Sequence, residues 1–352
     1  MYPTIGKTGV LLVNLGTPDA PTRGAVYRYL KQFLLDRRVI DYPWLARQLL
    51  VRGIIAPFRS GKSAKLYQQL WTPEGSPLKV YGERVTAGLQ NQLGSEYLVQ
   101  LAMRYQNPGI PAALQSLQQA GVSNIVVFPM FPQYASATTG SVHDEVMRIV
   151  RSWESIPGIQ FINSYYDYPP MIRLFAERAR AFDLESYDHI LFSYHGLPQR
   201  QLKKADLHHH CLQQENCCRS LGPHNQFCYS AQCYGTTQAI ASALNLSPDQ
   251  YTTTFQSRLG PEAWAQPYTS QVIEERAKKG DKRLLVFCPA FVADCLETLI
   301  EIGHEYQEEF EALGGEKVDL VPSLNDHPDW IAAIAGLVRG APVERPAVAG
   351  VK

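Results

Sequence analysis

Short apolar runs, rich in valine, isoleucine, leucine and phenylalanine, recur along the chain and are separated by amphipathic segments. In the first half they fall at residues 10–15, 97–103, 125–130 and 159–162. In the second half they fall at residues 190–194, 253–257, 284–288 and 318–321. Continuously apolar strands that alternate with helices are typical of parallel sheets covered on both faces, so the pattern predicts an α/β fold.

The segments between these runs have the period of amphipathic helices. Helices are predicted at residues 24–34, 112–120, 170–181, 231–244, 292–313 and 330–339. We predict two four-stranded, doubly wound halves joined near residues 165–170, although no internal sequence repeat relates them. The predicted domains are residues 1–167 and 168–325, and the last helix, within residues 326–345, is expected to pack back on the first domain. Residues 341–352 are expected to form a poorly ordered tail.

The composition and the absence of certain motifs argue against several classes of function. The 352 residues include 33 Lys and Arg against 33 Asp and Glu, so nothing favours nucleic acid as a partner. No glycine-rich phosphate-binding motif follows a predicted strand. Neither a signal peptide nor a run of about 18 apolar residues is found, which predicts a cytoplasmic protein. Peripheral association with the inner membrane stays open, as does the choice between monomer and homodimer.

Candidate chemistry lies where strands end, because ligands in such folds bind beyond the carboxyl ends of the strands. His195 directly follows the apolar run at residues 190–194. An imidazole at this place can bind a metal ion or move a proton near neutral pH. A histidine hydrogen-bonded to the loop backbone is an equal alternative.

Four acids follow the run at residues 284–288. On a helix Glu297, Glu301 and Glu305 fall at i, i+4 and i+8, and Asp294 lies one turn earlier, so one face carries a column of carboxylates. A solvated acidic face is the commoner meaning of such a column, but this one is surrounded by apolar residues. Carboxylates facing an imidazole suit a borderline divalent ion such as ferrous iron, or a proton relay.

Five of the seven cysteines lie within one polar segment, residues 206–233. They are Cys211, Cys217, Cys218, Cys228 and Cys233. Four thiolates can bind zinc tetrahedrally or a two-iron, two-sulfur (2Fe-2S) cluster, and sequence spacing does not choose between the two. The segment therefore predicts a metal centre of one kind or the other.

Six segments resemble motifs of the ferrochelatase family and occur in that family's order. They are LVNLGTP at 12–18, EGSPL at 74–78, FPQYASATTGS at 131–141, SYHGLP at 193–198, QSRLG with a tryptophan at 256–264, and CPAFVADCLETLIEIG at 288–303. The resemblance implies a chelatase-like fold, in which two similar Rossmann-like domains grip protoporphyrin IX between them. It also implies a lyase that inserts ferrous iron into protoporphyrin IX to form protohaem, releases two protons and completes haem biosynthesis.

The resemblance further assigns roles to individual residues. His195, Glu297 and Asp294 would be catalytic, and it leaves open which of His195 and Glu297 takes protons and which binds iron. Glu301 and Glu305 would extend a conduit to the surface. The residues that contact the porphyrin would be Leu15, Arg59, Tyr67, Ser76, Arg104, Tyr134 and Trp264. Residues 42–58 would form either an apolar lip over the pocket or an ordinary helix.

Because some members of the family bind a 2Fe-2S cluster, the resemblance favours that cluster over zinc. Adjacent cysteines do not easily bind one centre together, so the expected ligands are Cys211, Cys218, Cys228 and Cys233, with Cys217 as the alternative. Two other functions stay open at this point. One is a chelatase for another metal or tetrapyrrole, and the other is a redox sensor in which the cysteine-rich segment is the functional part.

Overall fold

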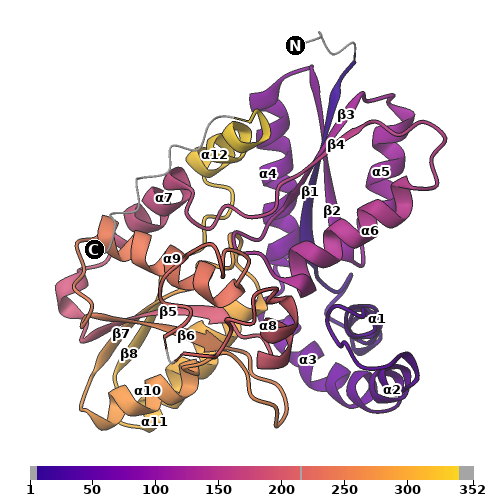
Figure 1. Cartoon of the computed structure of the whole chain (residues 1–352). Coiled ribbons are helices and arrows are strands. Elements are labelled where there is room, and N and C mark those ends of the chain that lie inside the picture. Colours follow the sequence, from indigo (N-terminus) through magenta and orange to yellow (C-terminus); the bar gives the residue numbers. More distant parts are fainter. Residues whose placement is uncertain (1–5, 215, 341–352) are drawn as a thin grey trace.

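The computed structural model describes residues 6–214 and 216–340 and contains two parallel four-stranded sheets (Figure 1). The first has the order β2-β1-β3-β4, with β1 (Thr8–Gly16), β2 (Tyr97–Tyr105), β3 (Asn124–Pro129) and β4 (Gly158–Phe161). The second has the order β6-β5-β7-β8, with β5 (His189–His195), β6 (Tyr251–Gln256), β7 (Arg283–Phe287) and β8 (Lys317–Leu320). The predicted fold class and the eight predicted strands are confirmed.

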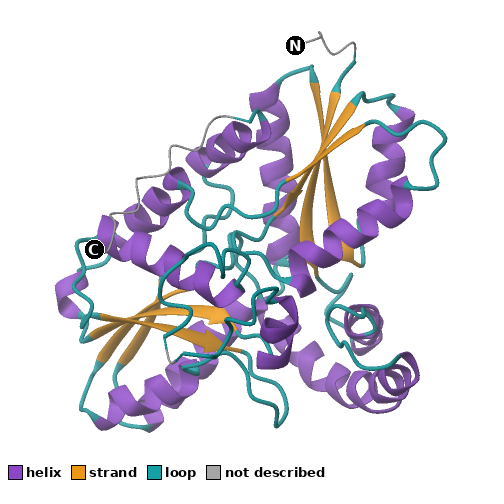
Figure 2. Cartoon of the chain, viewed as in Figure 1, coloured by secondary structure: helices purple, strands orange, loops and turns teal. Residues whose placement is uncertain are grey.

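Helices cover both faces of each sheet (Figure 2). In the first half they are α1 (Arg23–Leu34), α2 (Trp44–Leu49), α3 (Ala56–Leu70), α4 (Pro77–Leu93), α5 (Ile110–Gln119) and α6 (Ser141–Val150). In the second half they are α7 (Pro169–Ala179), α8 (Gln199–Ala205), α9 (Tyr229–Ala243), α10 (Thr269–Lys278), α11 (Gln307–Ala312) and α12 (Pro328–Val338). In this half the predicted helices at residues 24–34 and 112–120 match α1 and α5. Helices α3, α4 and α6 were not predicted, and α2 lies in residues 42–58, for which an ordinary helix was one of the two expectations. None of the described helices is both long and apolar enough to cross a membrane.

The two halves repeat one topology, although the sequence shows no repeat. In each sheet the first strand of the half lies between the second and the third. The repeat extends to details: the Met103 N–H donates to the Pro108 carbonyl after β2, and the Phe255 N–H donates to the Pro267 carbonyl after β6. The carboxyl ends of corresponding strands therefore offer corresponding positions for side chains in each half.

One apolar core runs through both halves. It joins Phe128 of the first sheet to Phe192 and Phe287 of the second by way of Tyr165 and Trp330, and all five side chains are buried. Trp330 lies on α12, which returns from the second half to lie beside α4 and α7 (Figure 1). The predicted tail, residues 341–352, and the end of the predicted last helix lie outside the described residues.

The predicted helix at residues 292–313 is wrong in its start and its geometry. Residues 292–295 are irregular, and there Asp294 accepts hydrogen bonds from the Ser323 N–H and the Asn325 side chain. From there a π-helix, η4 (Glu297–Tyr306), precedes α11. A π-helix has i→i+5 hydrogen bonds and is frequent at functional sites. The four acids therefore do not form one α-helical column. Another π-helix, η2 (Ser136–Gly140), follows β3 at the corresponding place in the first half, and η1 (Leu50–Ile55), also a π-helix, lies between α2 and α3.

Candidate active site and cysteine loop

His195 is the last residue of β5 and is half-buried. Its Nδ1 lies 2.7 Å from the carbonyl oxygen of Gly196. A carbonyl only accepts hydrogen bonds, so Nδ1 carries the proton and Nε2 keeps its lone pair. The Trp264 ring lies 6.3 Å from the imidazole, centroid to centroid. The structure thus presents an imidazole with a free basic nitrogen at a strand end.

Gln256 connects His195 to the acidic segment. It is the Cα partner of His195 in the β5–β6 ladder, and its Nε2 donates to the Glu297 carbonyl at 2.9 Å and to the Glu301 carboxylate at 3.0 Å. Glu301 also accepts from the N–H and the hydroxyl of Ser257, at 2.9 and 2.6 Å. Gln256 therefore holds the strand end at His195 through its backbone and the start of η4 through its buried side-chain amide. It was not among the predicted site residues.

Glu297 lies where the two halves meet. Its helical neighbours Leu296 and Ile300 pack into the apolar cluster that α1 and α3 build around Tyr29 and Tyr67. Burial and then the nearby Glu297 carboxylate raise the pKa of Tyr29, so this phenol stays neutral. The same two causes act on Tyr67, together with the adjacent Tyr29. Tyr67 was predicted to line the site, whereas Tyr29 was missed because its spacing in α1 is that of an ordinary core residue.

The other three acids differ in their surroundings. Asp294 is buried, and its carboxylate accepts from the Thr298 hydroxyl at 3.1 Å and from the Asn325 amide at 2.7 Å. Glu301 is half-buried and Glu305 is exposed. Asp294 thus fixes the turn before η4, whereas Glu297, Glu301 and Glu305 lead along the π-helix toward solvent.

Six of the seven predicted porphyrin contacts lie in the first half. Leu15 packs in the same cluster as Tyr67. Arg104 is engaged by Asp36 at 2.7 Å and by the Ser141 hydroxyl at 2.7 Å. The remaining three are Ser76, which is buried and bonded to Thr17, Arg59, which is exposed on α3, and Tyr134, whose N–H donates to the Gln232 side chain at 2.8 Å. Trp264, also predicted, lies beside His195 as described above.

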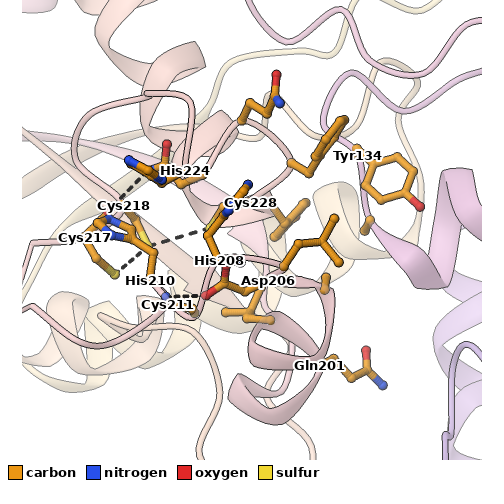
Figure 3. Close-up of a pocket in the computed structure, with 18 of the residues that line it drawn as sticks. Tyr134, Gln201, Asp206, His208, His210, Cys211, Cys217, Cys218, His224 and Cys228 are labelled. Atoms are coloured by element: carbon orange, nitrogen blue, oxygen red, sulfur yellow. Dashed lines mark hydrogen bonds between the residues drawn. The ribbon is translucent and has the colours of Figure 1, made fainter.

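The cysteine loop, residues 206–228, connects α8 to α9 and gathers four thiols (Figure 3). The Sγ atoms of Cys217 and Cys218 are 3.4 Å apart, and those of Cys218 and Cys228 are 3.9 Å apart. Thiolates around one tetrahedral metal with bonds of about 2.3 Å are separated by roughly 3.8 Å. Burial and the neighbouring Cys228 and Cys217 thiols raise the pKa of Cys211 to about 12. The two sulfur–sulfur distances are close to this spacing, but within residues 6–214 and 216–340 no group of three or more His, Cys, Asp or Glu side chains is arranged so that it could hold a metal ion.

Cys233 differs from these four thiols. It is fully buried inside α9 and lies beside Tyr229. A turn brings the sulfur atoms of the adjacent Cys217 and Cys218 to 3.4 Å, so both side chains are directed to the same place. A cavity beside the four gathered thiols is lined by Gln201, Asp206, His208, His210 and His224, and by Tyr134 from the first half (Figure 3). The cysteine loop therefore lines the same cavity as Tyr134, one of the predicted porphyrin contacts.

Comparisons with known proteins agree with this geometry. The family model described as Ferrochelatase matches residues 7–341. A ferrochelatase from Coxiella burnetii is 46% identical over 95% of this chain and 93% of its own length, and one from Legionella pneumophila is 45% identical over 94% and 98%. Among solved structures, the sirohydrochlorin chelatase SirB from Bacillus subtilis subspecies spizizenii in complex with cobalt has a TM-score of 0.52 at 12% identity, covering 97% of each chain. SirB from Bacillus subtilis with Fe3+ has a TM-score of 0.51 at 13% identity, covering 95% of this chain and 94% of that chain. At these identities the structural likeness concerns the fold alone.

Proposed function

The chain belongs to the ferrochelatase family, and on that premise we propose that His195 accepts the pyrrole protons while Glu297 binds the incoming iron. The enzyme is a lyase-class metal chelatase that inserts ferrous iron into protoporphyrin to form haem. A chelatase for another tetrapyrrole and a redox sensor are not favoured, since the family match covers nearly the whole chain. The observation that carries the proposal is the Nδ1 bond to Gly196, which leaves Nε2 of His195 as a base.

The charge balance of the reaction explains why both groups are needed. One Fe²⁺ replaces two pyrrole N–H protons, so the macrocycle keeps its charge and two protons must leave. Nε2 of His195 takes each proton and passes it to solvent before the next transfer. The Glu297 carboxylate offsets the cation before the pyrrole nitrogens bind it. Both groups stabilise the macrocycle most strongly when the iron is partly inserted and the protons are leaving. Stabilising this state more than the bound substrates raises the rate.

We extend the proposal to an iron route along η4. Exposure increases from Glu297 and Glu301, which are half-buried, to Glu305, which is exposed. Gln256 and Ser257 hold the middle carboxylate in place. Carboxylate oxygens at successive depths would carry a divalent ion from solvent to the macrocycle. Asp294 is assigned a supporting role, because the bonds to its carboxylate fix the turn on which Glu297 stands.

Replacing Glu297 with glutamine tests the division of roles. Because the neutral amide no longer offsets the cation, we expect the KM for ferrous iron to rise by about 10- to 100-fold. Removing a hydrogen-bonding partner of a metal ligand lowers metal affinity by a factor of this size. The KM for protoporphyrin should stay near that of the wild type. Glu308→Gln, at an exposed position on α11, is the matched control. An unchanged KM for iron, with only kcat lowered, would assign the proton to Glu297 instead.

We propose that Cys211, Cys217, Cys218 and Cys228 bind a 2Fe-2S cluster, with zinc as the alternative. The sulfur spacings of 3.4 and 3.9 Å support this set. Zinc and the cluster use the same thiolates, and the family resemblance favours the cluster. When bound, the group would crosslink the loop and supply a one-electron redox centre. Iron insertion transfers no electrons, so the centre stands outside the reaction.

We also propose a cytoplasmic enzyme whose lip, residues 42–58, binds an anionic membrane surface. The lip presents the exposed side chains of Trp44, Leu45, Leu49, Ile54 and Phe58. Residues 42–73 contain three Arg and two Lys and no Asp or Glu. Exposed apolar side chains beside basic ones are typical of interfacial membrane binding.

Vesicle co-sedimentation tests the lip. We expect the protein to bind vesicles of anionic phospholipid, more weakly at higher salt, and hardly to bind vesicles of zwitterionic phospholipid. Phe58→Glu removes one inserted side chain worth about 1.5–3 kcal/mol, so binding should fall by at least about tenfold. Met147→Glu, at an exposed position on α6, should leave binding unchanged. Equal binding of both variants would exclude the lip as the contact surface.

A further inference from the structure

The first turn of α9 is hydrogen-bonded to a candidate site residue in each half, His195 in the second and Tyr134 in the first. The hydroxyl of Tyr229 donates to the carbonyl of His195 at 2.8 Å, and the Gln232 side chain accepts from the N–H of Tyr134 at 2.8 Å. Tyr229 and Gln232 are both buried, and the cysteine loop ends directly before them at Cys228. One helical turn therefore holds both the backbone of the candidate base and the backbone of Tyr134 in the first half.

The bond from Tyr229 fixes the peptide that orients the imidazole. The His195 carbonyl of this peptide is held by Tyr229, and the Gly196 N–H is held by the Gln256 carbonyl at 2.9 Å. The next carbonyl, that of Gly196, accepts from Nδ1 of His195. A Cβ on Gly196 would lie 3.0 Å from the Gln256 carbonyl oxygen, so the neighbouring strand packs closely against this glycine. Losing the Tyr229 bond frees one end of this peptide and with it the direction of Nε2.

The bonds from Gln232 fix the backbone at Tyr134. While its Oε1 holds the Tyr134 N–H, its Nε2 donates to the Gln226 carbonyl in the cysteine loop at 2.9 Å. One turn further, the Thr236 hydroxyl accepts from the Gln133 side chain at 2.9 Å. The segment that carries Tyr134 is thus bonded to α9 at two successive residues, and its place depends on that helix.

We propose that Tyr229 and Gln232 are positioning residues for iron insertion, the first acting through His195 and the second through Tyr134. The inference rests on the roles proposed for His195 and Tyr134 and adds the group that orients each of them. It predicts opposite kinetic signatures. Misorientation of His195 lowers kcat, whereas displacement of Tyr134 weakens porphyrin binding and raises the KM for protoporphyrin.

The test compares two tyrosines that join the same strand to the same helix. Tyr229→Phe should lower kcat about tenfold, with the KM for protoporphyrin within twofold of wild type, because a buried carbonyl loses its partner. Tyr194→Phe is the matched control: its hydroxyl is also buried and joins β5 to α9 through Thr237 at 2.9 Å. The control should lose a similar amount of thermal stability while kcat and KM stay within twofold.

A second variant tests the role of Gln232 at Tyr134 independently. Gln232→Met keeps the side-chain volume and removes both bonds, so the KM for protoporphyrin should rise about tenfold with kcat changed less. The inference is overturned if Tyr229→Phe and Tyr194→Phe lower kcat equally, or if Gln232→Met leaves KM unchanged. Assaying His195→Gln in parallel separates the two levels: full activity there refutes the proposed role of His195 itself, whatever the tyrosine variants do.

Discussion

His195→Gln is expected to lower kcat for iron insertion by about 10²- to 10⁴-fold, the range that a positioned general base contributes. Glutamine retains a donor for the Gly196 carbonyl but has no basic nitrogen, so the pyrrole protons lose their acceptor. Porphyrin binding should be almost unchanged, because the imidazole is one small part of the cleft. The measurements are the anaerobic loss of protoporphyrin fluorescence after addition of ferrous iron, and the quenching of protein fluorescence by porphyrin alone.

The control for this variant lies at the other end of the same strand. His189 is buried at the start of β5, where its Nε2 lies 2.8 Å from the Thr252 hydroxyl, and His189→Gln should keep wild-type kcat. If His195→Gln raised the KM for ferrous iron and left kcat intact, His195 would be the iron ligand. The roles proposed for His195 and Glu297 would then be exchanged.

Cys217→Ser is expected to abolish cluster binding, whereas Cys233→Ser should retain it. Cys217 lies 3.4 Å from Cys218 in the gathered set, while Cys233 is enclosed within α9. Hydroxyl oxygen is a poor replacement for thiolate, so the visible absorption and the iron and acid-labile sulfide of anaerobically purified protein should disappear only in the first variant. The melting temperature should fall with them, because metal binding contributes directly to folding free energy.

The converse result would restore the ligand set expected from the sequence. If Cys233→Ser lost the chromophore and Cys217→Ser kept it, the loop would have to rearrange around α9 on binding. A colourless wild-type protein that contains stoichiometric zinc would exclude the cluster and keep the same thiolates as ligands. Cys288→Ser, at a buried position outside the loop, is the control for general effects of removing a thiol.

The strands could be predicted from the sequence because each buried parallel strand is a continuous apolar run. β5 and β7 show this most clearly: Ile190 to Phe192 and Leu284 to Phe287 are almost completely inaccessible to solvent. His195 could be found for the same reason, since a polar side chain directly after such a run must lie at the edge of the sheet. Glu297 was selected with its neighbouring acids because they follow a strand and are surrounded by apolar residues, but its individual role depended on the family resemblance. Trp264 depended on the resemblance altogether, because nothing in its local pattern separates it from surface or core residues.

Three features could not be predicted, two of them because they depend on contacts distant in sequence and one because it depends on the geometry of a turn. The π-helix η4 begins only after Asp294 is held by Asn325, which lies 31 residues later. The proximity of Cys217 and Cys218 depends on a turn that no spacing rule encodes. Gln256 resembles any other strand residue until the fold brings Glu297 and Glu301 to its amide. Local propensity carries none of this information.

The continuous interior that passes through Tyr165 and Trp330 affects how a rigid, flat substrate can enter. Two domains with a small polar contact rotate freely, but rotation here would open voids in a close-packed core. The angle between the two sheets is therefore set by the folded protein and offers no hinge. By contrast, α1 and α3 have a separate apolar cluster, to which the described part of the second half adds only Leu296 and Ile300. We therefore expect these outer helices to move when the macrocycle enters and leaves, while the two sheets form a fixed frame.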